Sequence, residues 1–104
     1  MKKIYRQGDV LLVPAQAIPA EAKAQTHLTL AYGEVTGHHH RFAPDSAATF
    51  FRPDDAGMGG GWLEVRETAL LEHEEHTAIA IPPGLYRVAI QVEETPEAVR
   101  RVED

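Results

Sequence analysis

The chain has 104 residues, of which 43% are hydrophobic and 25% charged, with a formal net charge of −6. This length and composition are typical of one globular domain, and the acidic balance disfavours nucleic-acid binding because it repels phosphate groups. Cysteine is absent, which excludes disulfides, thiolate metal sites, iron–sulfur clusters and cysteine nucleophiles.

The N-terminal segment predicts neither export nor membrane insertion. Its first apolar run, residues 10–13, is too short for the core of a signal peptide. No stretch approaches the roughly 20 apolar residues of a membrane-spanning helix. We therefore expect a cytoplasmic protein without a membrane partner, and the sequence leaves open a homo-oligomer or a protein partner.

The first third of the chain predicts two strands with a connection between them. Residues 10–14 are apolar, end in proline and follow a bend at Gly8, which predicts a strand buried on both faces. Residues 20–25 fit either one or two helical turns or a loop. Residues 27–32 alternate, so that the two leucines and Tyr32 share one face of a second strand.

The remainder predicts further short strands and one helix. Thr95 fits an N-cap, Pro96 the first helical position and Glu97 the positive end of the helix dipole, so a short C-terminal helix is expected to continue to residue 103. The expected strands are residues 38–42, 47–52, 62–67, 69–73, 78–81 and 85–92. About seven short strands favour one mainly β domain over residues 1–104, a small barrel or a sandwich.

The sequence contains two histidine clusters at predicted turns, and the first is His38-His39-His40. Imidazole is the commonest protein metal ligand near neutral pH. Side chains alternate along an extended segment, so His38 and His40 point one way and His39 the other. The alternative interpretation is a polar turn with solvated rings.

The second cluster, His73-Glu74-Glu75-His76, resembles the zinc-protease motif only superficially. That motif places two histidines four residues apart on a helix. Here the spacing is three, and residues 77–84 predict a strand followed by a turn, so a metalloprotease is excluded. In a turn the two histidines can still converge, with a glutamate as a further ligand, an outer partner or a general base.

If the two clusters meet, they supply up to four nitrogens to one divalent transition metal, such as zinc, iron or nickel. Three histidines and water suit zinc, whereas two histidines and a carboxylate suit ferrous iron. The expected ligands are His38, His40, His73 and His76, with Glu75 as the carboxylate. No catalytic residue is identified, and an enzymatic role stays open. The alternative is a protein-interaction module in which the histidines are polar turn residues.

Several segments together resemble a family of short, uncharacterised bacterial β-rich proteins: residues 7–14, 33–38 and 73–76, and the Pro82-Pro83-Gly84-x-Tyr86 turn. A partial resemblance to cupins, small metal-binding β-barrels, comes from the spacing of His38 and His40 and from the proline-glycine turn. The sequence departs from the cupin pattern because no glutamate follows His40 within reach and Arg87 stands where the third histidine belongs. The resemblance implies a barrel, in which His73 or His76 substitutes for the missing ligand.

Overall fold

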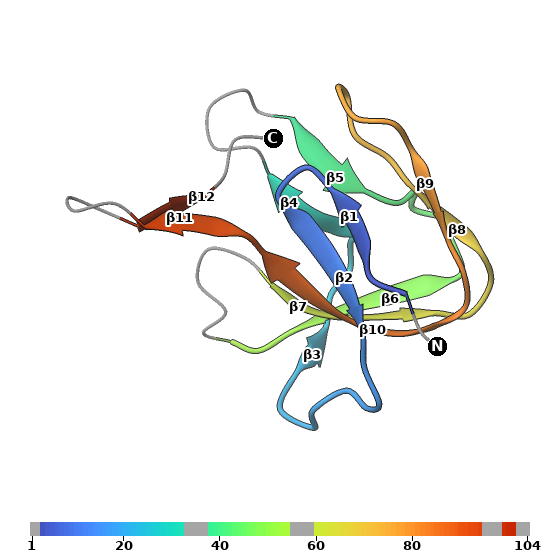
Figure 1. The fold of residues 1–104 in the computed structure, drawn as a ribbon. Helices are drawn as coiled ribbons and strands as arrows, with labels where there is room; N and C mark the ends of the chain where they lie inside the picture. The colour runs from blue at the N-terminus through green and yellow to red at the C-terminus, as the bar shows by residue number, and fades with distance from the viewer. Residues whose placement is uncertain (1–2, 33–37, 55–59, 95–98, 102–104) are drawn as a thin grey trace.

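The computed structural model describes residues 3–32, 38–54, 60–94 and 99–101, which form antiparallel β-sheets (Figure 1). Within these residues, no helix is long and apolar enough to span a membrane. The strands of the described residues are β1 (Tyr5–Gln7), β2 (Val10–Pro14), β3 (Lys23–Ala24), β4 (Thr29–Tyr32), β5 (His39–Arg41), β6 (Ala48–Arg52), β7 (Gly61–Val65), β8 (Ala69–Leu71), β9 (Ile79–Ile81), β10 (Gly84–Ile90), β11 (Val92–Glu94) and β12 (Val99–Arg101).

The largest sheet has six strands in the order β1-β2-β10-β7-β6-β3, with antiparallel neighbours. Its first two strands form a hairpin in which Gln7 pairs with Val10 across the two-residue turn Gly8–Asp9. Gly8 has a φ of 59°, a conformation that glycine adopts without steric cost, so the bend expected here is confirmed. The hairpin places Gln7 and Asp9 at one end of the sheet.

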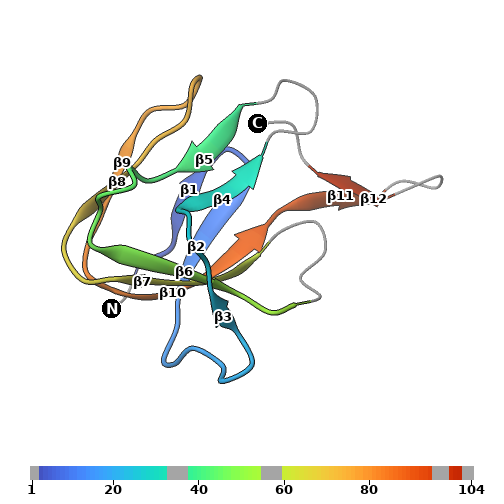
Figure 2. The ribbon, with the colours of Figure 1, turned by 180° about the vertical axis from the view of Figure 1, so that it is seen from behind.

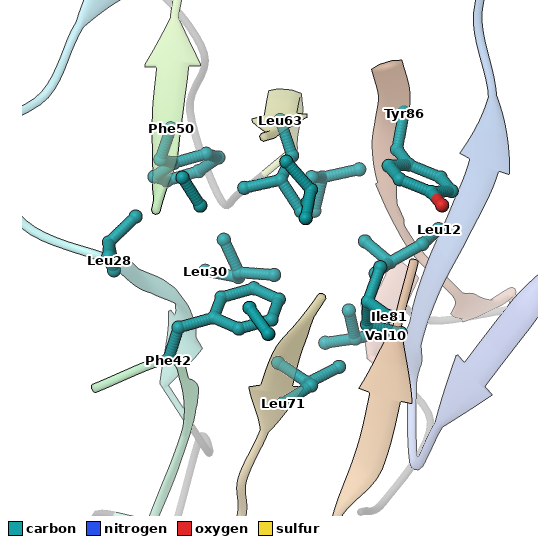
Figure 3. Packing of buried hydrophobic residues seen from close by; sticks show 14 of the residues in the cluster. Val10, Leu12, Leu28, Leu30, Phe42, Phe50, Leu63, Leu71, Ile81 and Tyr86 are labelled. Atoms are coloured by element: carbon teal, nitrogen blue, oxygen red, sulfur yellow. The ribbon is translucent and has the colours of Figure 1, made fainter. Parts of the chain in front are cut away.

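The hydrophobic core lies between this sheet and two short sheets, β4–β5 and β8–β9 (Figure 3). The large sheet contributes buried side chains that meet those of the short sheets, as expected for packed β layers. The labelled members of this core are Val10, Leu12, Leu28, Leu30, Phe42, Phe50, Leu63, Leu71, Ile81 and Tyr86. The core therefore packs against β5, which contains His39 and His40, and against β8, which leads into the second histidine cluster.

Two expectations about strand faces are wrong. In β2, Val10 and Leu12 are fully buried but Leu11 and Val13 only partly, so one face is buried rather than both. In β4, the pairing register with β5 shifts between Thr29 and Ala31. A β-bulge of this kind redirects the residues that follow it, and Tyr32 is 60% exposed instead of sharing the buried face of the leucines.

The mainly β class is confirmed, but two finer expectations are wrong. The described strands form separate open sheets and not a closed barrel, since three of the sheets have only two strands each. Residues 99–101 form strand β12, paired with β11, instead of a C-terminal helix. A short helix is costly to nucleate, whereas this segment gains a hydrogen-bonded strand partner. The capping residues 95–97 lie outside the described residues.

The segment for which either helical turns or a loop was expected, residues 20–25, contains no helix. It is a loop that ends in β3, which pairs with β6. A further backbone hydrogen bond, from Gln25 N to Phe50 O, holds this connection to the edge of the sheet.

Candidate metal centre

The two histidine clusters are joined by one pair of backbone hydrogen bonds. Arg41 N donates to Glu72 O at 3.0 Å, and Glu72 N donates to Arg41 O at 2.8 Å, which forms an antiparallel bridge between β5 and the residue after β8. Both ribbon views place β5 beside the β8–β9 hairpin (Figures 1 and 2). Continuing this register by one residue places position 40 opposite position 73.

Side-chain contacts follow the same register along both segments. The rings of His40 and His73 are 4.3 Å apart between centroids. Positions 39 and 74, the next pair in this register, are linked by a hydrogen bond of 3.0 Å from His39 N to Glu74 Oε1. In the third pair, His38 Nδ1 lies 3.0 Å from Glu75 Oε1. The bridge therefore aligns the whole of one cluster against the other.

His73 is the central ring in a group of four imidazoles. Its ring centroid is 4.3 Å from that of His40, 4.6 Å from that of His76 and 5.6 Å from that of His38. The rings of His40 and His76 are 6.0 Å apart. The structure thus brings together all four histidines that were expected to be ligands.

Gln7 fixes the position of the second cluster. Its amide Nε2 donates to Leu71 O and to Thr77 O, each at 3.0 Å, so it holds both ends of the turn that carries His73 and His76. Both amide hydrogens are used in this way, and Oε1 lies 2.8 Å from His40 Nδ1. A carbonyl oxygen only accepts, so His40 carries its proton on Nδ1 in this contact.

The inner end of the cluster is enclosed by the core. His40 is fully buried and Asp9 is 1% exposed, with 3.4 Å between His40 Nε2 and Asp9 Oδ1. His76 Nε2 is also shielded from solvent and makes no hydrogen bond within the part of the chain that the structure describes. Buried polar atoms are costly unless they are paired or bind an ion.

His38 lies at the outer end, where its ring is partly exposed. The carboxylate of Glu75 beside Nδ1 favours a proton on that nitrogen, which leaves Nε2 with its lone pair. Metal-binding histidines commonly donate the second ring N–H to a carboxylate or carbonyl oxygen in this manner. Glu75 therefore lies where it can orient His38, in addition to being a carboxylate that could itself bind an ion.

His73 uses its Nδ1 to cap its own turn. This atom accepts backbone N–H groups from Glu75 at 3.0 Å and from His76 at 3.3 Å. In the neutral ring the proton then sits on Nε2, and an ion can take Nε2 only if these two bonds are released. His73 and two neighbours, His38 and Glu74, nevertheless offer nitrogen and carboxylate atoms that all lie within 4.8 Å of one another.

Glu74 lies on the outer side of the cluster and is held by the facing strand. Its largest interaction is the backbone N–H of His39, and Arg41 adds a hydrogen bond of 3.0 Å. The backbone N–H of His39, followed by the backbone N–H of Glu74 itself and by Arg41, lowers the pKa of Glu74 from 4.5 to about 2, against an opposing effect of desolvation. His39 itself stacks on Tyr32, with 5.5 Å between ring centroids, and its Nδ1 is 3.6 Å from Glu74 Oε2.

The lowered pKa of Glu74 predicts a pH-dependent contribution to stability. Because the pKa is lower in the folded state, the contribution is complete above pH 4.5 and is lost as the pH falls toward 2. The Glu74→Gln variant should therefore be less stable than the wild type at neutral pH, with the difference shrinking below pH 4.5. Urea denaturation of both proteins across this range measures it. A Glu67→Gln variant, at an exposed site, is the control, and a pH-independent difference for Glu74→Gln would contradict the prediction.

The sequence reasoning missed two buried polar residues of this centre. The Gln7-Gly8-Asp9 segment could bind a divalent cation by its residue types, but a solvated turn was favoured for it, and neither residue was among the expected ligands. The only available signal was their place on either side of Gly8, at a hairpin turn that polar residues normally occupy in solvent. His27 lies outside the cluster; its Nδ1 accepts a hydrogen bond from Thr29 N at 3.2 Å, and its ring contacts Phe50.

A family model described as "Domain of unknown function (DUF8820)" matches residues 6–91. The chain belongs to this family. The DUF8820 match confirms an uncharacterised family and gives no support to the cupin resemblance. It includes Gln7 and Asp9 as well as both histidine clusters, so the whole candidate centre lies within the family domain. No curated protein and no solved structure matches the chain.

Proposed function

We propose that this DUF8820 protein binds one divalent transition metal ion at the histidine cluster. The observation that carries the proposal is the contact between two sequence-distant histidine pairs, with His73 within 5.6 Å of each of the other three rings. Two imidazoles that share a tetrahedral ion, with bonds of about 2.0–2.1 Å, have ring centroids roughly 5–6 Å apart. The separation of 5.6 Å between His38 and His73 falls in that range, and the separations of 4.3 and 4.6 Å to His40 and His76 are shorter.

The donor chemistry of the cluster fits a cation. His40 has an oxygen acceptor at Nδ1, which leaves Nε2 as its coordinating nitrogen. His38 Nδ1 lies 3.0 Å from the carboxylate of Glu75. The carboxylates of Asp9, Glu74 and Glu75 all lie within 4 Å of an imidazole nitrogen, which adds negative charge around the rings.

The expected ligand set is unchanged: His38, His40, His73 and His76, with Glu75 as the carboxylate candidate. His73 joins it when its ring releases the turn that it caps. Nitrogen and carboxylate donors of this kind suit zinc, iron or nickel, and the absence of cysteine disfavours ions that require thiolate. A metal-bound water beside Glu74 or Glu75 would give hydrolytic chemistry, for which no reaction is assigned.

Metal analysis of protein purified without a tag tests the proposal. After growth with added zinc, iron and nickel, we expect about one ion per chain, as for a single dedicated site. The double variant His38→Ala/His76→Ala should lose the ion, because it removes one nitrogen from each cluster. His27→Ala is the matched control, since it removes a histidine outside the cluster.

Two results would reject metal binding. One is wild-type protein with less than about 0.1 ion per chain after supplementation. The other is equal metal content in the double variant and in the His27→Ala control. Either result would favour the protein-interaction module, in which substitution of these histidines changes the free energy of unfolding by no more than about 0.5 kcal/mol.

A further inference from the structure

At the outer end of the cluster, three side chains already hold their donor atoms close together. His38, His73 and Glu74 each offer one nitrogen or carboxylate oxygen, and these three atoms all lie within 4.8 Å of one another. No other three histidine or acidic side chains in the described part of the chain meet this spacing. Two ligands of a tetrahedral ion with bonds of about 2.0–2.1 Å are about 3.4 Å apart, so shifts of about 1 Å bring the three atoms onto one ion.

The carboxylate of Glu74 is fixed in position by the strand that faces it. Its Oε1 accepts the backbone N–H of His39 at 3.0 Å, and its Oε2 accepts Arg41 Nη1 at 3.0 Å. A carboxylate oxygen has two lone pairs, so each of these oxygens retains a lone pair for an ion. A donor that is oriented before the ion arrives is the arrangement that favours tight binding.

Glu75, the carboxylate expected from the sequence to be the ligand, is placed differently. Its side chain is 58% exposed, and its Oε1 lies 3.0 Å from His38 Nδ1. It does not belong to the group of three close donors. A carboxylate beside one nitrogen of a metal-binding ring is typical of an outer partner, which orients the ring without touching the ion.

We propose that Glu74, and not Glu75, is the carboxylate ligand of the ion, together with one nitrogen each from His38 and His73. This inference rests on the proposed metal-binding function and places the ion at the outer end of the cluster. The side chains of His38 and Glu74 are 29% and 33% exposed, so solvent reaches the remaining coordination positions. Two imidazoles and one carboxylate form the donor set of open ferrous iron and catalytic zinc sites, which accept water or a small anionic ligand.

An ion held in this way changes the turn that carries His73. The Nδ1 atom of this ring accepts the backbone N–H groups of Glu75 and His76. An ion on Nδ1 takes that lone pair directly, and an ion on Nε2 moves the ring proton to Nδ1. Both hydrogen bonds are released in either case, so the amide resonances of Glu75 and His76 should shift when Zn²⁺ is added to the wild-type protein.

Two isosteric substitutions, Glu74→Gln and Glu75→Gln, separate the roles of the two carboxylates. Each removes one negative charge from an exposed residue with little change in size. Untagged protein is stripped of metal, and Zn²⁺ affinity is measured by competition with a chromogenic chelator. We expect Glu74→Gln to weaken Zn²⁺ binding by more than about 100-fold, and Glu75→Gln by about 10-fold, near the lower end of the effect of an outer partner.

A third variant, Arg41→Gln, separates coordination by Glu74 from a purely structural role. It breaks the ion pair between Arg41 and Glu74 but keeps the carboxylate. The Zn²⁺ affinity should stay at the wild-type level or rise, because a positive charge beside the carboxylate is removed. A loss as large as that in Glu74→Gln would assign the effect to the ion pair and overturn the inference.

The outcomes separate this inference from the function on which it rests. A loss in Glu74→Gln no larger than that in Glu75→Gln overturns the Glu74 assignment while metal binding stands. Unchanged amide resonances of Glu75 and His76 in the zinc-loaded wild type also overturn it, and this measurement decides if circular dichroism shows that Glu74→Gln is unfolded. A wild-type protein that does not bind Zn²⁺, Fe²⁺ or Ni²⁺ overturns both the inference and the proposed function.

Discussion

Replacing Gln7 with Leu should destabilise the metal-free protein by at least about 2 kcal/mol, because a buried group left without its hydrogen bond costs about 1–3 kcal/mol. The substitution removes the amide that binds Leu71 O, Thr77 O and His40 Nδ1, and Gln7 is only 2% exposed. Zn²⁺ affinity should fall by about 10–100-fold, as for other outer partners of a metal ligand. Urea denaturation and chelator competition measure the two effects.

Gln25 provides a matched control for this change. Its amide donates to Lys23 O within an exposed connection, so Gln25→Leu removes a hydrogen bond that water can replace. The control variant should stay within about 0.5 kcal/mol of the wild type and keep its metal affinity. Equal behaviour of the two variants would show that Gln7 does not hold the cluster together.

Replacing Phe42 with Ala should lower the free energy of unfolding by about 3–5 kcal/mol, the usual cost of removing a buried phenylalanine. Phe42 is 2% exposed and lies in the centre of the core, between the layers in Figure 3. Its backbone N donates to Leu28 O at 3.0 Å, immediately beyond the β5 segment that carries His40. The loss of packing should therefore also loosen the inner end of the centre. Urea denaturation of metal-free protein avoids any contribution from a bound ion.

Leu70→Ala is the control for Phe42→Ala. Leu70 lies in β8 next to the buried Leu71, but it is 48% exposed, so its loss should cost no more than about 0.5 kcal/mol. A cost below about 1.5 kcal/mol for Phe42→Ala would show that the core around β5 readily collapses into the space left behind.

The sequence pattern predicted local features well where two-residue periodicity governs the chain. In β10, Tyr86 and Val88 are buried and Arg87 is exposed, as alternation requires. The first histidine cluster behaves similarly: His38 and His40 contact His73, whereas His39 stacks on Tyr32. Alternation along a strand depends only on residues that are adjacent in the chain, so it can be predicted from a single sequence.

Features that depend on distant segments could not be predicted. The bridge between Arg41 and Glu72 determines which histidine faces which glutamate, and nothing in either cluster specifies that register. The burial of Asp9 also contradicts its local sequence, because a polar residue after glycine normally lies in a solvated turn. Prediction from local sequence also failed for residues 99–101. They pair with the distant strand β11 instead of continuing the helix that the capping residues before them predicted.

The position of Gln7 has a consequence for the order in which the protein folds. Its amide joins residues that are 33, 64 and 70 positions away along the chain, so closing these contacts requires long loops to form first. Contacts of this kind belong to the later part of folding, and interactions that are absent from the transition state act mainly on the unfolding rate. An ion held by this centre would therefore prolong the lifetime of the folded protein without accelerating its formation.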